Sequence, residues 1–103
     1  MFQDFPKYSE FEQESYLQGS KTTIEEILNK EIVIVAFQNE PSKVNKNSTY
    51  NKIQIIDEYI EDKPQYKIFF SGSKVLDKQL KKYKQQLPFR ATIIKQNNYY
   101  TLT

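Results

Sequence analysis

The order of the predicted strands and helices constrains the fold of this chain more than any other feature of its sequence. Short runs rich in β-branched and aromatic residues predict five strands, and a basic stretch with helical spacing predicts one helix after the third strand. The predicted strands are Glu31–Phe37, Ile53–Ile60, Tyr66–Ser71, Phe89–Lys95 and Tyr99–Thr103, and the predicted helix is Lys74–Gln86. This β-β-β-α-β-β order is typical of the five-stranded OB-type barrel, whose strand 2–3 face and neighbouring loops bind oligonucleotides or oligosaccharides.

The part of the chain before the first predicted strand has a different character. Residues 1–20 combine aromatic side chains with carboxylates and contain Pro6, which argues against one long helix. Thr23, with Glu26 three residues later, matches a capping box and predicts a short helix. With 103 residues the chain can form one hydrophobic core. We therefore expect an acidic N-terminal arm over residues 1–20 and a mainly β, OB-fold domain over residues 21–103.

The composition argues against most kinds of catalytic site. The sequence contains no Cys and no His, which excludes cysteine nucleophiles, Cys/His zinc sites and the commonest general base. Only two glycines are present, so the sequence has no glycine-rich phosphate loop. We expect that the protein is not an enzyme and that it uses no cofactor and no metal. It has no apolar run long enough for a membrane helix and no secretory signal, so we expect a cytoplasmic protein that does not bind membranes.

The net charge of +2 hides a strong asymmetry along the chain. Residues 1–62 carry six Lys against twelve Asp and Glu, whereas residues 63–103 carry eight Lys and Arg90 against Asp77 alone. Such segregation suggests an acidic segment and a basic surface with different tasks, and a basic surface favours a polyanionic ligand. The alternative is that the two halves neutralise each other in the folded protein.

The third predicted strand suggests how a binding face would be built. Its alternating residues form two sets, and the more apolar set of Tyr66, Ile68 and Phe70 is predicted to face the core. The other set then places Phe69 beside Lys67 on the outer face. An aromatic ring next to a cation is the combination that stacks on a base and contacts its phosphate. An exposed ring covered by the arm or by the helix is the alternative interpretation.

These considerations predict a set of nucleic-acid-binding residues. The set combines aromatic residues with cationic ones. The cationic residues come from the long loop before the second strand, from the strands and from the start of the helix. The candidates are Lys43, Lys46, Lys52, Tyr59, Tyr66, Lys67, Phe69, Lys74, Lys78, Arg90, Lys95 and Tyr99. Lysines on a helix or a loop are often simply solvated, so the two helix positions rest on the weakest argument.

The arm supplies a second predicted surface. Aromatic residues recur along it at spacings of three, between carboxylates, which suits a segment that docks on a partner protein. The candidate partner-binding residues are Phe2, Asp4, Phe5, Tyr8 and Phe11. A terminal element that packs its aromatic rings on the barrel would explain the same pattern.

Several segments of the chain resemble small proteins of phages and mobile elements in low-GC Gram-positive bacteria. The resemblance covers about residues 24–103 and is carried by Glu31–Ile34, Pro41–Lys43, Phe69–Leu76, Leu87–Ile94 and Asn98–Leu102. These relatives look like compact OB-type proteins that bind single-stranded DNA or act in replication. The ordinary bacterial single-stranded-DNA-binding protein has a long C-terminal tail with an acidic tip. In this sequence the acidic and aromatic residues lie near the N-terminus instead.

The leading hypothesis is therefore a sequence-tolerant single-stranded DNA-binding protein that acts in replication or transfer of a mobile element. The second is an OB-fold accessory subunit that binds a polymerase, primase or helicase, which the acidic arm suits well. An RNA-binding protein is a third, since the sequence does not distinguish 2′-hydroxyl contacts. The oligomeric state is left open.

Overall fold

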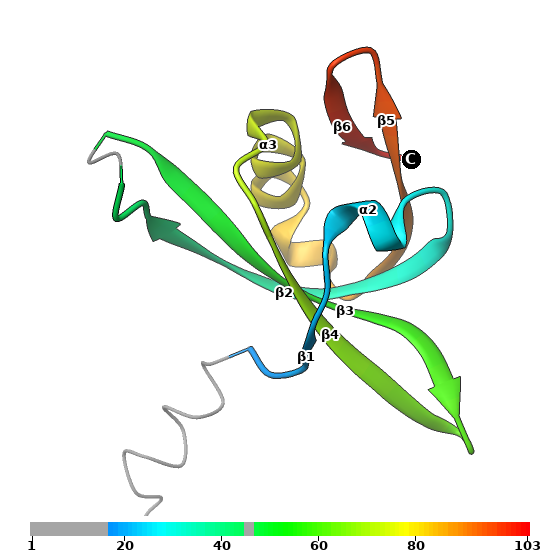
Figure 1. The fold of residues 1–103 in the computed structure, drawn as a ribbon. Coiled ribbons are helices and arrows are strands. Elements are labelled where there is room, and N and C mark those ends of the chain that lie inside the picture. Colours follow the sequence, from blue (N-terminus) through cyan, green and yellow to red (C-terminus); the bar gives the residue numbers. More distant parts are fainter. Residues whose placement is uncertain (1–16, 45–46) are drawn as a thin grey trace, which may run out of the picture.

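A computed structural model of the protein describes residues 17–44 and 47–103 (Figure 1). The fold is mainly β, and its strands form a six-stranded sheet in the order β1-β4-β3-β2-β5-β6. The strands are β1 (Ser20–Lys21), β2 (Glu31–Pro41), β3 (Thr49–Ile60), β4 (Lys63–Ser71), β5 (Phe89–Gln96) and β6 (Tyr99–Leu102). The helices are α2 (Ile24–Ile27), α3 (Lys74–Lys82) and the 3-10 helix η2 (Lys84–Gln86).

The five predicted strands are confirmed as β2 to β6, and the predicted helix as α3 followed by η2. The sixth strand, β1, was not predicted because it has only two residues, which pair in parallel with Lys67 and Ile68 of β4. β2, β3 and β4 form long antiparallel ladders, whereas β5 pairs with β2 only over Glu31–Ile34. The β5–β6 hairpin therefore leaves the plane of the other strands and stands beside α3 (Figure 1).

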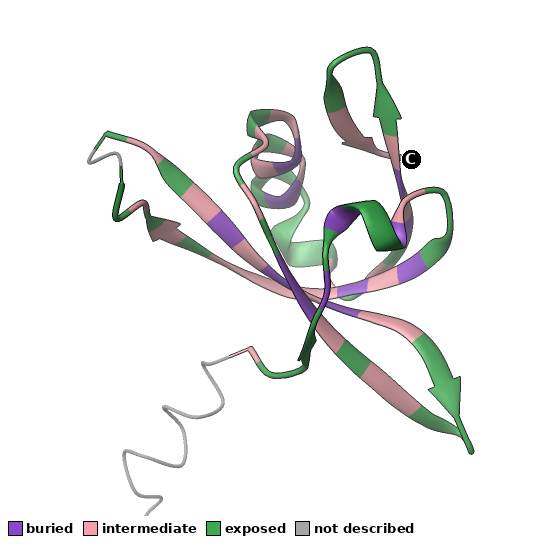
Figure 2. Cartoon of the chain, viewed as in Figure 1, coloured by how far each residue is buried: buried purple, intermediate pink, exposed green. Residues whose placement is uncertain are grey.

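The core lies between the inner face of this sheet and the two α-helices. Alternating residues of β2, β3 and β5 point inward, and α2 and α3 each contribute two buried side chains (Figure 2). The buried core consists of Ile24, Ile27, Ile32, Ile34, Ile53, Ile55, Phe69, Leu76, Leu80, Ala91 and Ile93. Tyr100 and Leu102 of β6 pack against it, whereas Tyr99 is 41% exposed.

The predicted orientation of β4 is wrong for its aromatic residues. Phe69 is completely buried, whereas Tyr66 and Phe70 are 42% and 43% exposed. Ile68, the third member of the predicted core set, is buried as predicted (4% exposed). The pairing with β3 explains the difference, because Phe69 stands opposite the inward-facing Ile53 and Lys67 stands opposite the inward-facing Ile55. The inward-facing set contains Lys67 and is therefore the less hydrophobic of the two. A prediction from hydrophobicity alone assigned it to the outer face.

The helix starts differ in how they are capped. Ser73 accepts a hydrogen bond at its Oγ from the Leu76 amide (3.2 Å), as expected of an N-cap serine. The predicted capping box of α2 is wrong, because the Thr23 side chain makes no capping bond. Instead, the neighbouring Thr22 donates from its hydroxyl to Glu26 Oε2 (2.8 Å).

Helix α3 also supports the last strand through one side chain. Gln79 Oε1 accepts a hydrogen bond from the Leu102 amide (2.9 Å), and Gln79 Nε2 donates to the Thr101 hydroxyl (2.9 Å). The Leu102 amide is on the edge of β6 that faces away from β5, since the backbone of the next residue, Thr103, pairs with Thr92. Gln79 thus stands where a further strand would lie.

Candidate nucleic-acid interface

The outward-facing side chains at the centre of β3 and β4 form a continuous surface, called here the outer face. Its position follows from strand alternation, because the intervening Ile53, Ile55 and Phe69 are buried in the core. Register pairs place Lys52 beside Phe70, Gln54 beside Ile68 and Ile56 beside Tyr66. The outer face consists of Tyr50, Lys52, Gln54, Ile56, Tyr66, Ile68 and Phe70, of which Ile68 is itself buried (4% exposed).

An exposed aromatic ring with a cation beside it lies on this face. The Phe70 ring meets Tyr50 edge-on, with ring centroids 5.9 Å apart and planes inclined by 61°. Lys21 Nζ lies 5.6 Å from the Phe70 centroid, within the range of a cation–π contact. Lys52 is the cross-strand neighbour of Phe70 and adds a second positive charge. These groups can stack on a base and contact phosphate at the same place.

Tyr50 is held in a fixed direction by a charged partner. Its hydroxyl donates to Glu40 Oε2 over 2.8 Å, and this hydrogen bond, together with partial burial and the Glu40 charge, raises the pKa of Tyr50. Its ring supports Phe70 from the side.

Of the predicted binding residues that the structure describes, two lie on the outer face, Lys52 and Tyr66. Phe69 lies in the core, where it offers no surface to a ligand. Lys67 points inward to Asp57, with 2.7 Å between its Nζ and Asp57 Oδ2. Sequence reasoning missed Lys21, Tyr50 and Phe70.

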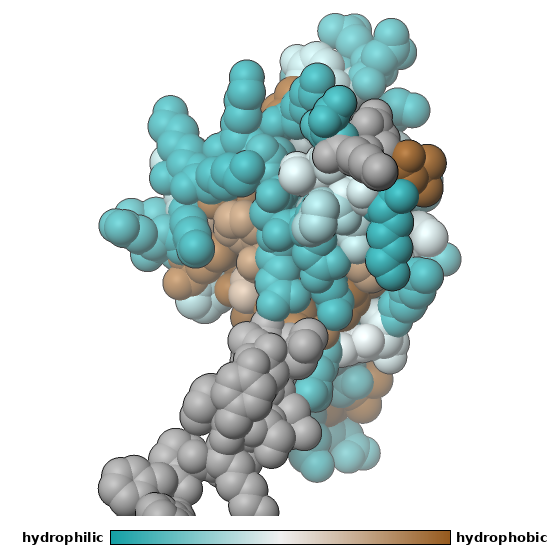
Figure 3. All heavy atoms as spheres, turned by 90° about the vertical axis from the view of Figure 1, so that its left-hand side faces the viewer, coloured by the Kyte–Doolittle hydropathy of each residue, from teal (hydrophilic) through white to brown (hydrophobic). Residues whose placement is uncertain are grey.

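Other predicted residues surround a polar pocket of about 510 Å³ where the β2–β3 loop meets the start of α3. Lys74 and Lys78 line it, together with Asn51, Asp77 and several small polar residues. Lys43 is exposed on the β2–β3 loop, and Lys46 lies outside the described residues. Hydrophilic side chains cover most of this side of the molecule (Figure 3).

Asp77 links three elements around this pocket. Its Oδ1 accepts hydrogen bonds from Asn51 Nδ2 (3.0 Å) and Asn39 Nδ2 (3.2 Å), and its Oδ2 lies 3.0 Å from Lys81 Nζ. Burial alone would raise the pKa of Asp77, but the bonds from Asn51 and Lys81 and the charge of Lys81 outweigh it, so the pKa is lowered. The carboxylate fixes the start of α3 against β2 and β3.

The remaining candidates lie apart from the outer face. Tyr59 is 62% exposed near the β3–β4 turn. Arg90 and Lys95 are on β5 and Tyr99 is on β6, and β2 separates these strands from β3. Arg90 makes a loose contact with Glu31, with 3.9 Å between their charged atoms.

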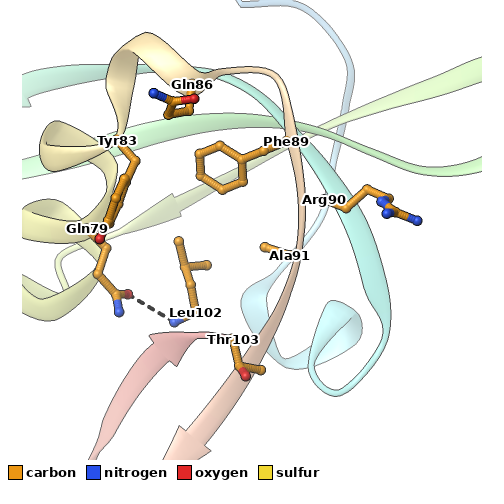
Figure 4. A pocket seen from close by; sticks show the side chains of 8 residues that line it. All are labelled: Gln79, Tyr83, Gln86, Phe89, Arg90, Ala91, Leu102 and Thr103. Atoms are coloured by element: carbon orange, nitrogen blue, oxygen red, sulfur yellow. Dashed lines mark hydrogen bonds between the residues drawn. The ribbon is translucent and has the colours of Figure 1, made fainter.

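A second pocket, of about 470 Å³ and mostly apolar, lies between α3, η2 and the β5–β6 hairpin (Figure 4). Phe89 and Leu102 point into it, whereas the Arg90 side chain extends away from it (Figure 4). The candidate partner-binding residues of the arm (Phe2, Asp4, Phe5, Tyr8 and Phe11) lie outside the described residues.

Comparison with known proteins gives one match. A family model described as a domain of unknown function, DUF8468, matches residues 18–103. This chain belongs to the DUF8468 family. No curated protein and no solved structure matches it. The DUF8468 match begins at Gln18 and includes every strand of the sheet, so residues 1–17 lie outside it.

The described part of the DUF8468 domain contains neither a metal-binding cluster nor a membrane-spanning helix. Among residues 17–44 and 47–103, no three His, Cys, Asp or Glu side chains come close enough to hold a metal ion. Every helix in this described part is too short or too polar to cross a membrane.

A buried carboxylate with two partly exposed lysines fixes the inner side of β4 in the DUF8468 domain. The Asp57 side chain is 2% exposed, and its Oδ2 lies 2.7 Å from Lys67 Nζ and 3.3 Å from Lys30 Nζ. Its Oδ1 is buried without a hydrogen-bond partner among the described residues. Burial raises the pKa of Asp57, but the bonds and charges of Lys67 and Lys30 outweigh it, so the pKa is lowered. The cluster keeps Lys67 on the inner side and away from the outer face.

We expect Asp57→Asn to destabilise the domain at neutral pH by about 1.5–3 kcal/mol, the range for hydrogen bonds to charged groups. Because the folded pKa of Asp57 is lowered, its contribution is complete above the unfolded value of about 4 and is lost as the pH falls through the folded pKa. Urea unfolding at pH 7 and at pH 3 should therefore show a large difference between wild type and variant at pH 7 and a smaller one at pH 3. Glu61→Gln, in the exposed β3–β4 turn, is the control. A difference independent of pH would contradict the role of the ionised carboxylate.

Proposed function

We propose that this DUF8468 protein binds single-stranded DNA on the outer face, with little sequence preference, in the replication or transfer of a mobile genetic element in the cytoplasm. The observation that carries the proposal is the exposed Phe70 ring between Tyr50 and Lys21, with Lys52 beside it. Stacking on an aromatic ring is worth roughly 1–3 kcal/mol per base and accepts any base.

An OB-type barrel is part of this proposal. β2 lies between β3 and β5, α3 is inserted between β4 and β5, and the order of the sheet ends at β6 on one side. These features support a partly open five-stranded barrel formed by β2 to β6, to which β1 is added. In such a barrel, β3 and β4 are the second and third strands, whose face is the usual oligonucleotide site.

A fluorescence anisotropy titration with a labelled thymidine oligonucleotide tests the proposal. We expect the single strand to bind more tightly than a duplex of the same length, and its affinity to fall steeply as salt rises, because phosphate contacts release counterions. Lys52→Gln should weaken binding and reduce the salt slope by about one, whereas Lys82→Gln, on the exposed side of α3, should change neither. No binding at low salt would reject the proposal.

A second candidate function is favoured by the end of the β3–β4 hairpin. Tyr59 and Ile60 are 62% and 52% exposed there, and the turn that follows is formed by Glu61 and Asp62. An apolar and acidic surface repels phosphate and suits a protein partner such as a polymerase, primase or helicase. Binding of such an enzyme without DNA, lost in Tyr59→Ala, would favour this function.

A further inference from the structure

The chain approaches the backbone of β4 very closely at Gly19. This residue has a φ of +152°, and a Cβ placed on it would lie 2.7 Å from both the carbonyl carbon and the carbonyl oxygen of Tyr66. Gly19 therefore lies directly against the β4 backbone, at a distance that only glycine allows. On its C-terminal side the chain continues along the β4 edge as β1.

On the N-terminal side of Gly19 the chain is within reach of the outer face. The Gln18 carbonyl accepts a hydrogen bond from Gln54 Nε2 over 2.9 Å. Gln54 is an outer-face residue of β3, so the backbone at Gln18 contacts a side chain of that face. Residues 1–16 therefore precede a point of the chain that lies beside the outer face.

The charge and the aromatic content of residues 1–16 complement those of the outer face. Residues 1–16 carry four carboxylates against one lysine, together with three Phe and two Tyr. The outer face presents the aromatic rings of Tyr66 and Phe70 and the cation Lys52, and Lys21 of β1 lies over the Phe70 ring. The neighbouring carboxylate Glu40 is bonded to Tyr50. Acidic and aromatic side chains are what such a surface attracts when nucleic acid is absent.

We infer that residues 1–16 dock on the outer face of their own chain and compete there with single-stranded nucleic acid. The competition rests on the proposed function, whereas the docking does not. Sixteen residues can extend over about 50 Å, and the outer face from Tyr50 to Ile56 spans about 20 Å of strand, so the segment can cover it. Attachment gives the segment a high effective concentration, typically in the millimolar range, so a weak contact is sufficient.

A spin label on the arm tests this directly. The sequence contains no cysteine, so Ser9→Cys provides a unique attachment point for a nitroxide in the full chain. We expect the amide resonances of Tyr50, Lys52 and Phe70, which lie away from the attachment at Gln18, to lose most of their intensity. The triple variant Glu10→Gln, Glu12→Gln, Glu14→Gln, carrying the same label, should restore most of it. Adding the thymidine oligonucleotide should also restore it, because the DNA displaces the segment.

The outcomes separate the docking from the DNA-binding proposal. Broadening at these three amides supports docking. If the oligonucleotide leaves that broadening unchanged and the anisotropy titration shows no binding, docking stands and the proposed function is rejected. Broadening limited to residues adjoining Leu17, or equal in the charge-neutralised variant, overturns the docking. Mixing spin-labelled chains with unlabelled, isotope-enriched chains detects exchange between molecules. Broadening of the same amides in that mixture, as strong as within one chain, would overturn docking on the same chain.

Discussion

Replacing Phe69 by alanine should lower the free energy of unfolding by about 3–5 kcal/mol. Its ring is completely buried opposite Ile53, between the sheet and the helices, so truncation leaves a cavity at the centre of the core. Domains of this size are typically stable by about 5–15 kcal/mol, so the variant would lose a large part of its stability. Urea unfolding followed by circular dichroism measures the loss.

The adjacent residue provides a matched control. Phe70 has the same side chain in the same strand, but it is 43% exposed on the outer face. Phe70→Ala should therefore cost only about 1 kcal/mol, corresponding to the smaller apolar area removed from the folded protein. Equal losses in the two variants would contradict the orientation of β4 in the structure.

The same Phe70→Ala variant should bind single-stranded DNA about 5- to 150-fold more weakly. This range corresponds to the loss of one stacking contact of roughly 1–3 kcal/mol. Phe70→Tyr keeps an aromatic ring at this position and should retain most of the affinity. The measurement is the anisotropy titration at a fixed, low salt concentration, since affinity for phosphate depends on ionic strength.

Tyr83→Ala is the matched control for this measurement. Tyr83 is an aromatic residue of similar exposure (47%), but it follows α3 and borders the apolar pocket away from the outer face. Its removal should leave DNA affinity unchanged. If Tyr83→Ala weakens binding as much as Phe70→Ala does, the ligand is not on the outer face.

The sequence predicts where the strands are better than how far they extend. Ile32 to Val35 are all β-branched, and so are three of the four residues from Ile53 to Ile56; such runs favour strands without help from distant residues. The extension of β2 to Pro41 and the start of β3 at Thr49 depend on pairing between polar residues, such as Asn39 with Asn51. Pairing of this kind leaves no hydrophobic pattern, so the hairpin was predicted as a longer loop.

The binding face was predicted only in part for a related reason. Hydrophobic alternation assigned the faces of β4, but a buried carboxylate, Asp57, draws Lys67 to the inner side. Asp57 comes from β3 and lies at an irregularity in the β3–β4 ladder, which a single sequence does not reveal. Lys21 reaches Phe70 only because Gly19 lets the chain approach β4, which is also a contact between distant residues.

The contact between Gln79 and β6 has a consequence for the behaviour of the protein at high concentration. An unprotected edge strand is a template on which a second chain can add a strand, and this is a common route to aggregation. By occupying the outward amide of Leu102, the glutamine side chain removes one of the donors that such an incoming strand would need. Gln79 thus protects against self-association, a role that its hydrogen-bond energy alone would not suggest.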